Sequence, residues 1–144
     1  MIEQDTIKLL RECDAGVKMG INSIDDVLPS VSDEKLKEAL SDSKKEHSEL
    51  DREIHELLNK YRDDGKEPGA IASGMSWIKT NVMLAVNESD STVSDLITDG
   101  CNMGVKSLNR YLNEYAAADE VSKDITKRLI KIEEKLADQI RKFL

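Results

Sequence analysis

Apolar residues recur at alternating steps of three and four along most of the 144-residue chain. This spacing places them on one side of an α-helix, because an α-helix has 3.6 residues per turn. The rhythm is clearest near the C-terminus, where the apolar stripe consists of Ile125, Leu129, Ile132, Leu136, Ile140 and Phe143. Such a stripe has to be buried against other helices, so the pattern predicts an all-α protein.

The rhythm is interrupted at only a few points, and these divide the chain into helices. Pro29, the stretch 65–69 and the polar run 87–91 carry residues typical of helix ends, and Asp119 is a suitable N-cap for the last helix. We therefore predict, within a single domain spanning 1–144, long helices at 2–28, 33–64, 91–117 and 120–143, and a short crossover helix at 69–86.

The order of these elements predicts a known architecture. The first two long helices form one hairpin, the last two form another, and the segment between the hairpins is long enough to cross the bundle. This connectivity is that of a ferritin-like four-helix bundle with one long crossover containing a short extra helix.

Charge and composition exclude several classes of function. The formal net charge of −8 repels a polyanion such as nucleic acid, and Lys and Arg are interleaved with acidic residues throughout the chain. The longest apolar runs, such as 82–86, are too short to span a bilayer, and the N-terminal residues lack the pattern of a signal peptide. We expect a cytoplasmic protein that binds neither nucleic acid nor membranes.

The motif Cys-x-x-Gly-Val-Lys occurs twice, beginning at Cys13 and at Cys101, and each copy lies inside a predicted helix. A glycine inside a helix costs about 1 kcal/mol relative to alanine, so Gly16, Gly20 and Gly104 require compensation. We expect the first and third long helices to approach each other closely at these glycines. The two cysteines are small enough to share that crossing.

The two cysteines stand 88 positions apart, a spacing that matches neither a disulfide framework nor a zinc site. The main interpretation is a pair of buried free thiols. The alternative is a redox pair across the helix crossing, although no nearby residue would activate a thiol.

Four stretches of the chain carry a resemblance to a known family: CDAGVKMGINSIDDVLPSVSDEKLKEAL, DGKEP, MSWIKTNVML and LITDGCNMGVKSLNRYL. Over these stretches the chain resembles the small ferritin-like four-helix bundles of bacteria, a mostly uncharacterised family with clostridial members. The resemblance spans most of the chain and implies the ferritin-like fold. Its motifs concern helix packing and imply no particular chemistry.

The resemblance does not extend to a di-iron site. Members of the wider superfamily that handle iron or manganese use a glutamate on each of two helices and Glu-x-x-His on each of the other two. This chain contains no Glu-x-x-His, and Lys44 stands three residues before His47. Val17 and Lys18 follow the first-helix glycine where a carboxylate would be needed. Neither ferroxidase nor peroxidase activity is therefore expected.

Asp14 and His47 are ionisable residues on the otherwise apolar seams of the first two helices. If the turn is centred between residues 30 and 31, residues at one level have numbers that sum to 61, and 14 and 47 satisfy this condition. Asn102 corresponds to Asp14 in the internal repeat. The main interpretation is a buried hydrogen-bonded layer of Asp14, His47 and Asn102 that fixes the helix register.

A metal site is the alternative interpretation of the same polar residues. Glu133 lies beside the stripe of the last helix, and mixed carboxylate and imidazole ligands suit zinc, iron or manganese. A single divalent ion would then be bound by Asp14, His47 and Glu133. His55, which lies among acidic residues beside the seam, is expected at the surface.

Two functions remain open from the sequence. The favoured hypothesis is a noncatalytic interaction or self-association module without a di-iron site or cofactor, which would form a homodimer or bind a protein partner that the sequence does not identify. The alternative is a metal-binding or redox protein with a reduced mononuclear site for a divalent metal.

Overall fold

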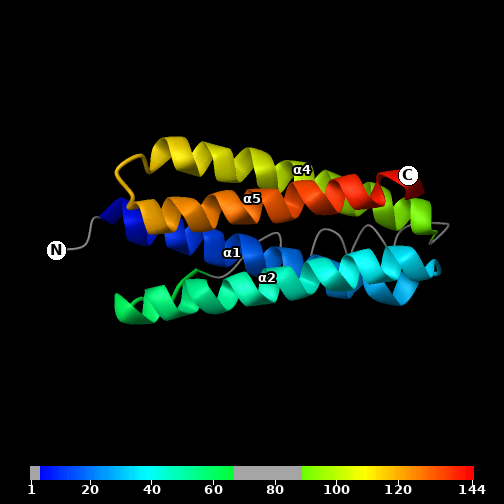
Figure 1. Ribbon diagram of the computed structural model, residues 1–144, viewed down its shortest axis with the longest axis horizontal. Coiled ribbons are helices and arrows are strands. Elements are labelled where there is room, and N and C mark those ends of the chain that lie inside the picture. The colour runs from blue at the N-terminus through cyan, green and yellow to red at the C-terminus, as the bar shows by residue number, and fades with distance from the viewer. Residues whose placement is uncertain (1–3, 67–88) are drawn as a thin grey trace.

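The described part of the chain is a bundle of four long helices. The computed structural model describes residues 4–66 and 89–144, and the structural statements below concern these residues. They contain no strand, and the prediction of an all-α four-helix bundle is confirmed. The long helices lie side by side in Figure 1 and comprise α1 (Gln4–Val27), α2 (Glu34–Lys60), α4 (Asp90–Glu114) and α5 (Glu120–Ile140). The crossover helix predicted at 69–86 lies outside the described residues.

Side-chain caps define three of the helix starts. The Asp33 carboxylate accepts hydrogen bonds from two backbone N–H groups at the start of α2, and Asp119 and Ser89 accept one each at the starts of α5 and α4. These bonds satisfy N–H groups that have no partner within the helix. Two short 3₁₀ helices, η1 (Leu28–Ser30) and η2 (Arg141–Phe143), continue α1 and α5.

The end of α2 is set by backbone conformation. The sequence places this boundary at residue 64, whereas α2 ends at Lys60. Arg62 and Gly65 then adopt positive φ angles of 56° and 83°, which turn the chain away from the helix axis. Residues 61–66, called the exit loop below, fold back towards α1.

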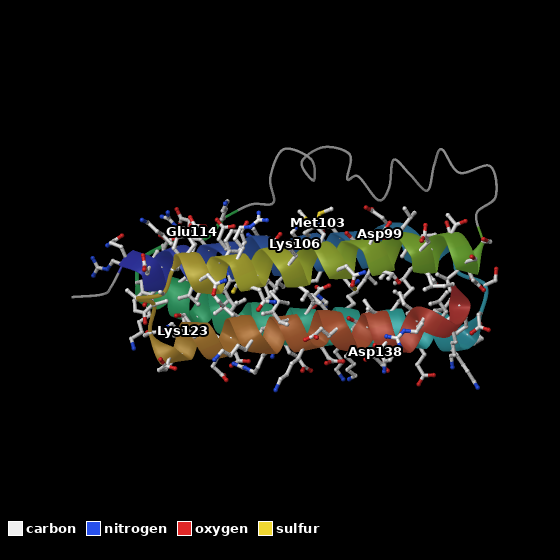
Figure 2. The ribbon with its side chains drawn as sticks, turned by 90° about the horizontal axis from the view of Figure 1, so that it is seen from above. Asp99, Met103, Lys106, Glu114, Lys123 and Asp138 are labelled. Carbon is white, nitrogen blue, oxygen red and sulfur yellow. The ribbon has the colours of Figure 1, made fainter. Side chains whose placement is uncertain are left out.

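The four helices are not equivalent in their packing. α1 and α5 each contact all three other helices, so they form the diagonal pair through the centre of the bundle. The start of α1 lies beside the end of α4, because the backbone N–H of Ala117 donates to Asp5 and that of Asp119 donates to Thr6. α1 and α4 are therefore antiparallel neighbours, as Figures 1 and 2 show.

The apolar core falls into two clusters along the bundle axis. One surrounds Ile24, Leu40 and Ile97 near the α1–α2 turn, and the other surrounds Val17, Ile54 and Leu129 towards the opposite end. Burying each such side chain fully contributes about 1.5–3 kcal/mol. Gly20, Ser43, His47, Gly104 and Glu133 lie between the two clusters in sequence along their helices.

Candidate functional site

A buried histidine–glutamate pair separates the two apolar clusters. Nε2 of His47 on α2 lies 2.7 Å from Oε1 of Glu133 on α5, and both side chains are buried. Nδ1 of the same ring lies 2.8 Å from the carbonyl oxygen of Ser43. His47 and Glu133 are two of the three predicted candidate ligands, and the structure brings these two together without Asp14.

The contacts of His47 determine its protonation. The Ser43 carbonyl can only accept, so Nδ1 must carry a proton and donate it. Burial of the ring opposes its charged form, but the hydrogen bond and charge of Glu133 outweigh burial and raise the pKa of His47. The geometry therefore supports a buried imidazolium–carboxylate pair.

Glycines make room for this pair. A Cβ atom added at Gly20 would lie 2.6 Å from Nε2 of His47, and one added at Gly104 would lie 3.7 Å from Cδ of Glu133. The α1 backbone thus lies directly against the imidazole. An alanine at position 20 would overlap the ring unless His47 moved.

The two repeat glycines do not meet each other, and the expected close crossing of α1 and α4 at Gly16 and Gly104 is wrong. A Cβ atom at Gly16 would contact Leu129 of α5, at 3.6 Å, whereas one at Gly104 would contact Glu133 of the same helix. Both glycines therefore face α5, one helical turn apart. The repeated motif does not indicate which helix its glycine contacts. The sequence pattern therefore could not predict the contact with α5.

The two cysteines are buried and free, and they belong to different apolar clusters. Sγ of Cys13 lies 3.2 Å from the Thr126 hydroxyl of α5. Burial raises the pKa of the Cys13 thiol to about 12 and that of Cys101 still further. At neutral pH both remain thiols, which are poor nucleophiles, and the structure gives no contact between them that a redox pair would need.

A second polar cluster lies between α1 and α2. Oδ1 of Asp14 lies 2.9 Å from Nε2 of His55, and the same ring nitrogen lies 3.4 Å from Oδ1 of Asp51. Oδ2 of Asp14 accepts hydrogen bonds from Nζ of Lys18, at 3.0 Å, and from the backbone N–H of Lys66, at 2.9 Å. We call Asp14, Asp51 and His55 the Asp14 cluster.

The exit loop is fastened to α1 beside this cluster. Arg11 makes a bidentate ion pair with Asp63, and Lys66 forms an ion pair with Glu12. The backbone N–H of Gly65 donates to the Asp63 carboxylate. Asp63 and Lys66 therefore anchor the exit loop to α1, at and just before the first copy of the Cys-x-x-Gly repeat.

The predicted pairing of Asp14 with His47 is wrong, because the helical hairpin turns later than a turn centred between residues 30 and 31. η1 continues α1 to Ser30, and α2 begins at Glu34, so the level sum is 64 and not 61. Side chains also lean towards the N-terminus of their own helix, so each contact is made by a residue about one position further along the chain. This raises the sum by about one for each helix, to about 66.

The corrected sum accounts for the observed contacts. Gly20 and His47 sum to 67, and Asp14 sums to 65 with Asp51 and to 69 with His55. Asp14 precedes Gly20 by six residues, which separates the Asp14 cluster from His47 by about 9 Å along α1.

One further expectation about the polar layer is wrong, and another holds in part. Asn102 is exposed on α4, so it does not join a buried layer with Asp14 and His47. His55, expected at the surface, is 42% exposed and contacts the fully buried Asp14. The spacing Asp51-x-x-x-His55 could have revealed this site, because residues at i and i+4 share one face of a helix.

The Asp14 cluster has the donor set of a small cation site. One ligand atom from each of Asp14, Asp51 and His55 lies within 4.8 Å of the others. Burial and the charge of nearby Asp14 raise the pKa of Asp51, against the lowering effect of His55. The carboxylates of Asp14 and Asp51 therefore lie close enough to repel each other unless a positive charge stands between them.

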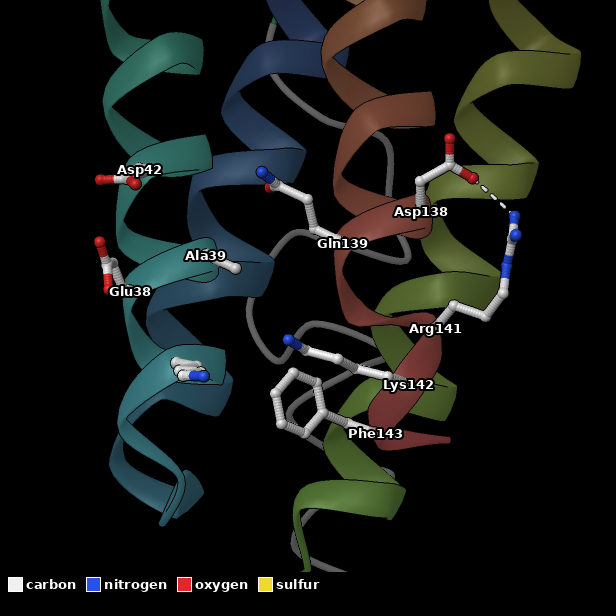
Figure 3. A pocket seen from close by; sticks show the side chains of 9 residues that line it. Glu38, Ala39, Asp42, Asp138, Gln139, Arg141, Lys142 and Phe143 are labelled. Carbon is white, nitrogen blue, oxygen red and sulfur yellow. Dashed lines mark hydrogen bonds and ion pairs between the residues drawn. The ribbon is translucent and has the colours of Figure 1, made fainter.

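A groove of about 610 Å³ lies between α2 and the C-terminal end of α5 with η2. Figure 3 shows side chains of both signs on its walls, with Arg141 paired to Asp138 at 2.6 Å and the Lys142 amine over the Phe143 ring. The mixture presents no concentrated charge to a ligand. Chemistry-bearing groups gather instead in the His47–Glu133 pair and the Asp14 cluster.

Comparison with known proteins supports the fold. The chain is similar to the crystal structure of a DUF305 fragment from Deinococcus radiodurans, with a TM-score of 0.77, 98% of this chain and 95% of that chain covered, and 11% sequence identity. At this identity the likeness shows the fold alone. No protein-family model and no curated protein matches the chain. Within the described residues, no helix is both long and apolar enough to cross a membrane.

Proposed function

We propose that the protein is a noncatalytic helical bundle that acts through protein–protein contact, and that its partner is a second copy of the same chain. The observation that carries this proposal is the surface of α4 around Met103. This side chain is 61% exposed in the middle of a long helix, where a soluble bundle would ordinarily present a polar residue.

A second exposed methionine lies at the same level. In antiparallel helices, residues at the same level have numbers with a nearly constant sum. For α1 and α4 this sum is 122 to 125, from the contacts of Asp5 with Ala117 and of Thr6 with Asp119. Met19 and Met103 also sum to 122, so they lie at one level. Met19 is 40% exposed on the neighbouring helix. Methionine side chains are flexible and polarisable, and they are common at surfaces that contact other proteins.

The charges beside Met103 are self-complementary. Asp99 and Lys106 follow along α4 on either side of Met103, as Figure 2 shows. If two copies of α4 packed antiparallel about Met103, residues at one level would sum to 206, and 99 and 106 sum to 205. Asp99 of each copy would then lie opposite the Lys106 of the other, as an isologous twofold interface requires.

The interior of the bundle supports a noncatalytic role. Both ring nitrogens of His47 are occupied by groups of the protein itself, and both thiols are buried with raised pKa values. These groups stabilise one arrangement of the helices and are not accessible to a substrate.

The proposal also covers the family, the type of partner and the cellular location of the protein. The quoted motifs support membership of the small ferritin-like bundles of bacteria, and the four-helix fold is compatible with it. The net charge of −8 supports a protein partner over nucleic acid. We propose a cytoplasmic location and no membrane partner on the composition of the chain.

Sedimentation velocity over a range of concentrations tests self-association. We expect the wild-type mass to rise from one chain to two, and Met103→Glu to remain at one chain. The matched control is Val121→Glu, because Val121 is 56% exposed on α5 and the same charge is introduced away from the proposed interface. A wild-type chain that stays monomeric, or a Met103→Glu chain that dimerises like Val121→Glu, would contradict the proposal.

A charge exchange tests the geometry of the interface. Asp99→Lys should weaken dimerisation, because the new lysine at position 99 of one copy would lie opposite Lys106 of the other copy. Combining it with Lys106→Asp should restore dimerisation by exchanging the signs. A double variant no better than the single variant would contradict the antiparallel pairing about Met103.

A further inference from the structure

The strongest feature that self-association leaves unexplained is the Asp14 cluster. Asp14 is contributed by α1, and Asp51 and His55 are contributed by successive turns of α2. One oxygen from each carboxylate and one imidazole nitrogen converge within 4.8 Å. Converging carboxylate and imidazole ligands are typical of sites for divalent transition metals.

The buried oxygens of this cluster have unused bonding capacity. Among the described residues, Oδ1 of Asp14 and Oδ1 of Asp51 are buried and accept no well-oriented hydrogen bond, and both face the same ring nitrogen of His55, at 2.9 and 3.4 Å. Asp14 is fully buried, so its carboxylate has lost its water. One imidazole nitrogen carries a single N–H and cannot satisfy two buried carboxylate oxygens, so the cluster favours a ligand that would complete their bonding.

The two oxygens of Asp14 have separate roles. Oδ2 is held by Lys18 and by the backbone N–H of Lys66, which fixes the plane of the carboxylate. Oδ1 is the oxygen that faces His55. The outer contacts thus orient Oδ1 towards the cluster, as hydrogen bonds around a metal ligand commonly do.

We propose that Oδ1 of Asp14, Oδ1 of Asp51 and Nε2 of His55 bind one divalent transition-metal ion, with zinc as the best-suited ion. Two carboxylates balance the charge of a divalent cation. Three protein ligands leave a fourth tetrahedral position for water, and the 42% exposed His55 gives the ion access from solvent. The site differs from a di-iron site in its ligands and in holding one ion.

The two distances from His55 to the carboxylates need only a small rearrangement. Ligand atoms about 2.05 Å from a tetrahedral zinc lie about 3.3 Å from one another. The 3.4 Å between His55 and Asp51 already matches this value, whereas the 2.9 Å between His55 and Asp14 has to lengthen by about 0.4 Å to reach the same spacing. His55 can supply this movement because its side chain is only half-buried.

The competing explanation is an imidazolium that itself bridges the two carboxylates. In that case no metal binds, and His55 alone neutralises the cluster. The two explanations differ in whether the purified chain takes up a stoichiometric ion, which is the quantity that the experiment measures.

The test uses the full chain, stripped of metal with a chelator and titrated with Zn²⁺ and Co²⁺ in a calorimeter and a visible-absorption cell. We expect one ion per chain, the intense visible absorption of tetrahedral cobalt, and displacement of cobalt by zinc. Asp51→Asn and His55→Gln should each weaken binding at least about tenfold. The control is Asp42→Asn, which removes an exposed carboxylate from the same helix and should bind like the wild type.

The outcomes are distinct from those of the self-association test. Met103→Glu should bind metal like the wild type, because the Asp14 cluster lies between α1 and α2 and not on the Met103 surface. Circular dichroism establishes that each variant is folded before titration. A folded wild-type chain that binds neither ion, or affinities unchanged in both Asp51→Asn and His55→Gln, would overturn the metal site.

Discussion

Nε2 of His47 lies 2.7 Å from Oε1 of Glu133, at the level where the two apolar clusters of the core are separated. A charged pair at this level opposes sliding of either helix. Sliding α2 or α5 along the bundle would place one buried charge against an apolar cluster, where it would have no partner. We expect this pair to specify the relative positions of the two helices.

Removing one partner of the pair should be more harmful than removing both. Glu133→Leu leaves a buried imidazolium without its acceptor and should lower the free energy of unfolding by about 3–5 kcal/mol. The double variant His47→Leu with Glu133→Leu should lose clearly less. Urea unfolding of the two variants and the wild type measures this, and a double variant as unstable as Glu133→Leu would contradict the pairing.

The stability of the bundle should fall as pH rises above neutrality. The folded-state pKa of His47 is raised above its usual value of 6.5, so the folded chain binds more protons than the unfolded chain between these two pKa values. The stabilisation is therefore complete below pH 6.5 and is lost as the pH rises through the folded-state pKa. Urea unfolding across this range should show the decline, and His47→Gln should flatten it.

The glycines should differ sharply when replaced by alanine. Gly20→Ala should destabilise by about 1–3 kcal/mol, because its Cβ would overlap the His47 ring. At Gly16 the new Cβ would make an ordinary contact with Leu129, so Gly16→Ala should be neutral or stabilising by up to about 1 kcal/mol. Thermal and urea melts decide this, and equal effects at the two positions would refute the assigned contacts.

The exit loop should depend on Gly65. Its φ of +83° disfavours any residue with a Cβ atom, and an added Cβ would also collide with Oδ2 of Asp14. Gly65→Ala should therefore destabilise by about 1–3 kcal/mol and expose the loop to proteolysis after α2. Asp64→Ala is the neighbouring control, and comparable protease resistance in the two variants would argue against the anchor.

Much of the fold could be predicted from the sequence, because helix periodicity and helix-ending residues are local signals. The boundaries at Pro29 and Asp119 illustrate this, since a proline and a capping carboxylate act on the backbone beside them. The same periodicity predicted the buried Leu129, Leu136 and Ile140 of α5. Ile132 of the predicted stripe is only partly buried, whereas Ile130, which lies off it, is buried.

The polar sites could not be predicted as readily, because they depend on contacts between helices. The sequence predicts that His47 is a buried polar residue, but whether Asp14 lies at its level depends on whether η1 lengthens α1 before the turn. A shift of a few residues in that turn changes the neighbour of Asp14 from His47 to Asp51 and His55. No local pattern encodes that shift, whereas the spacing of Asp51 and His55 was a usable signal.

The orientation of the repeat glycines also has a consequence for the symmetry of the molecule. If the two hairpins were related by an exact twofold axis, Gly16 would face α5 and Gly104 would face α2. Both face α5, so the glycines of the repeat allow close packing against α5 and not against its counterpart α2. Backbone amides of α5 should therefore exchange with deuterium more slowly than those of α2, which places α2 among the first long helices to open in native-state fluctuations.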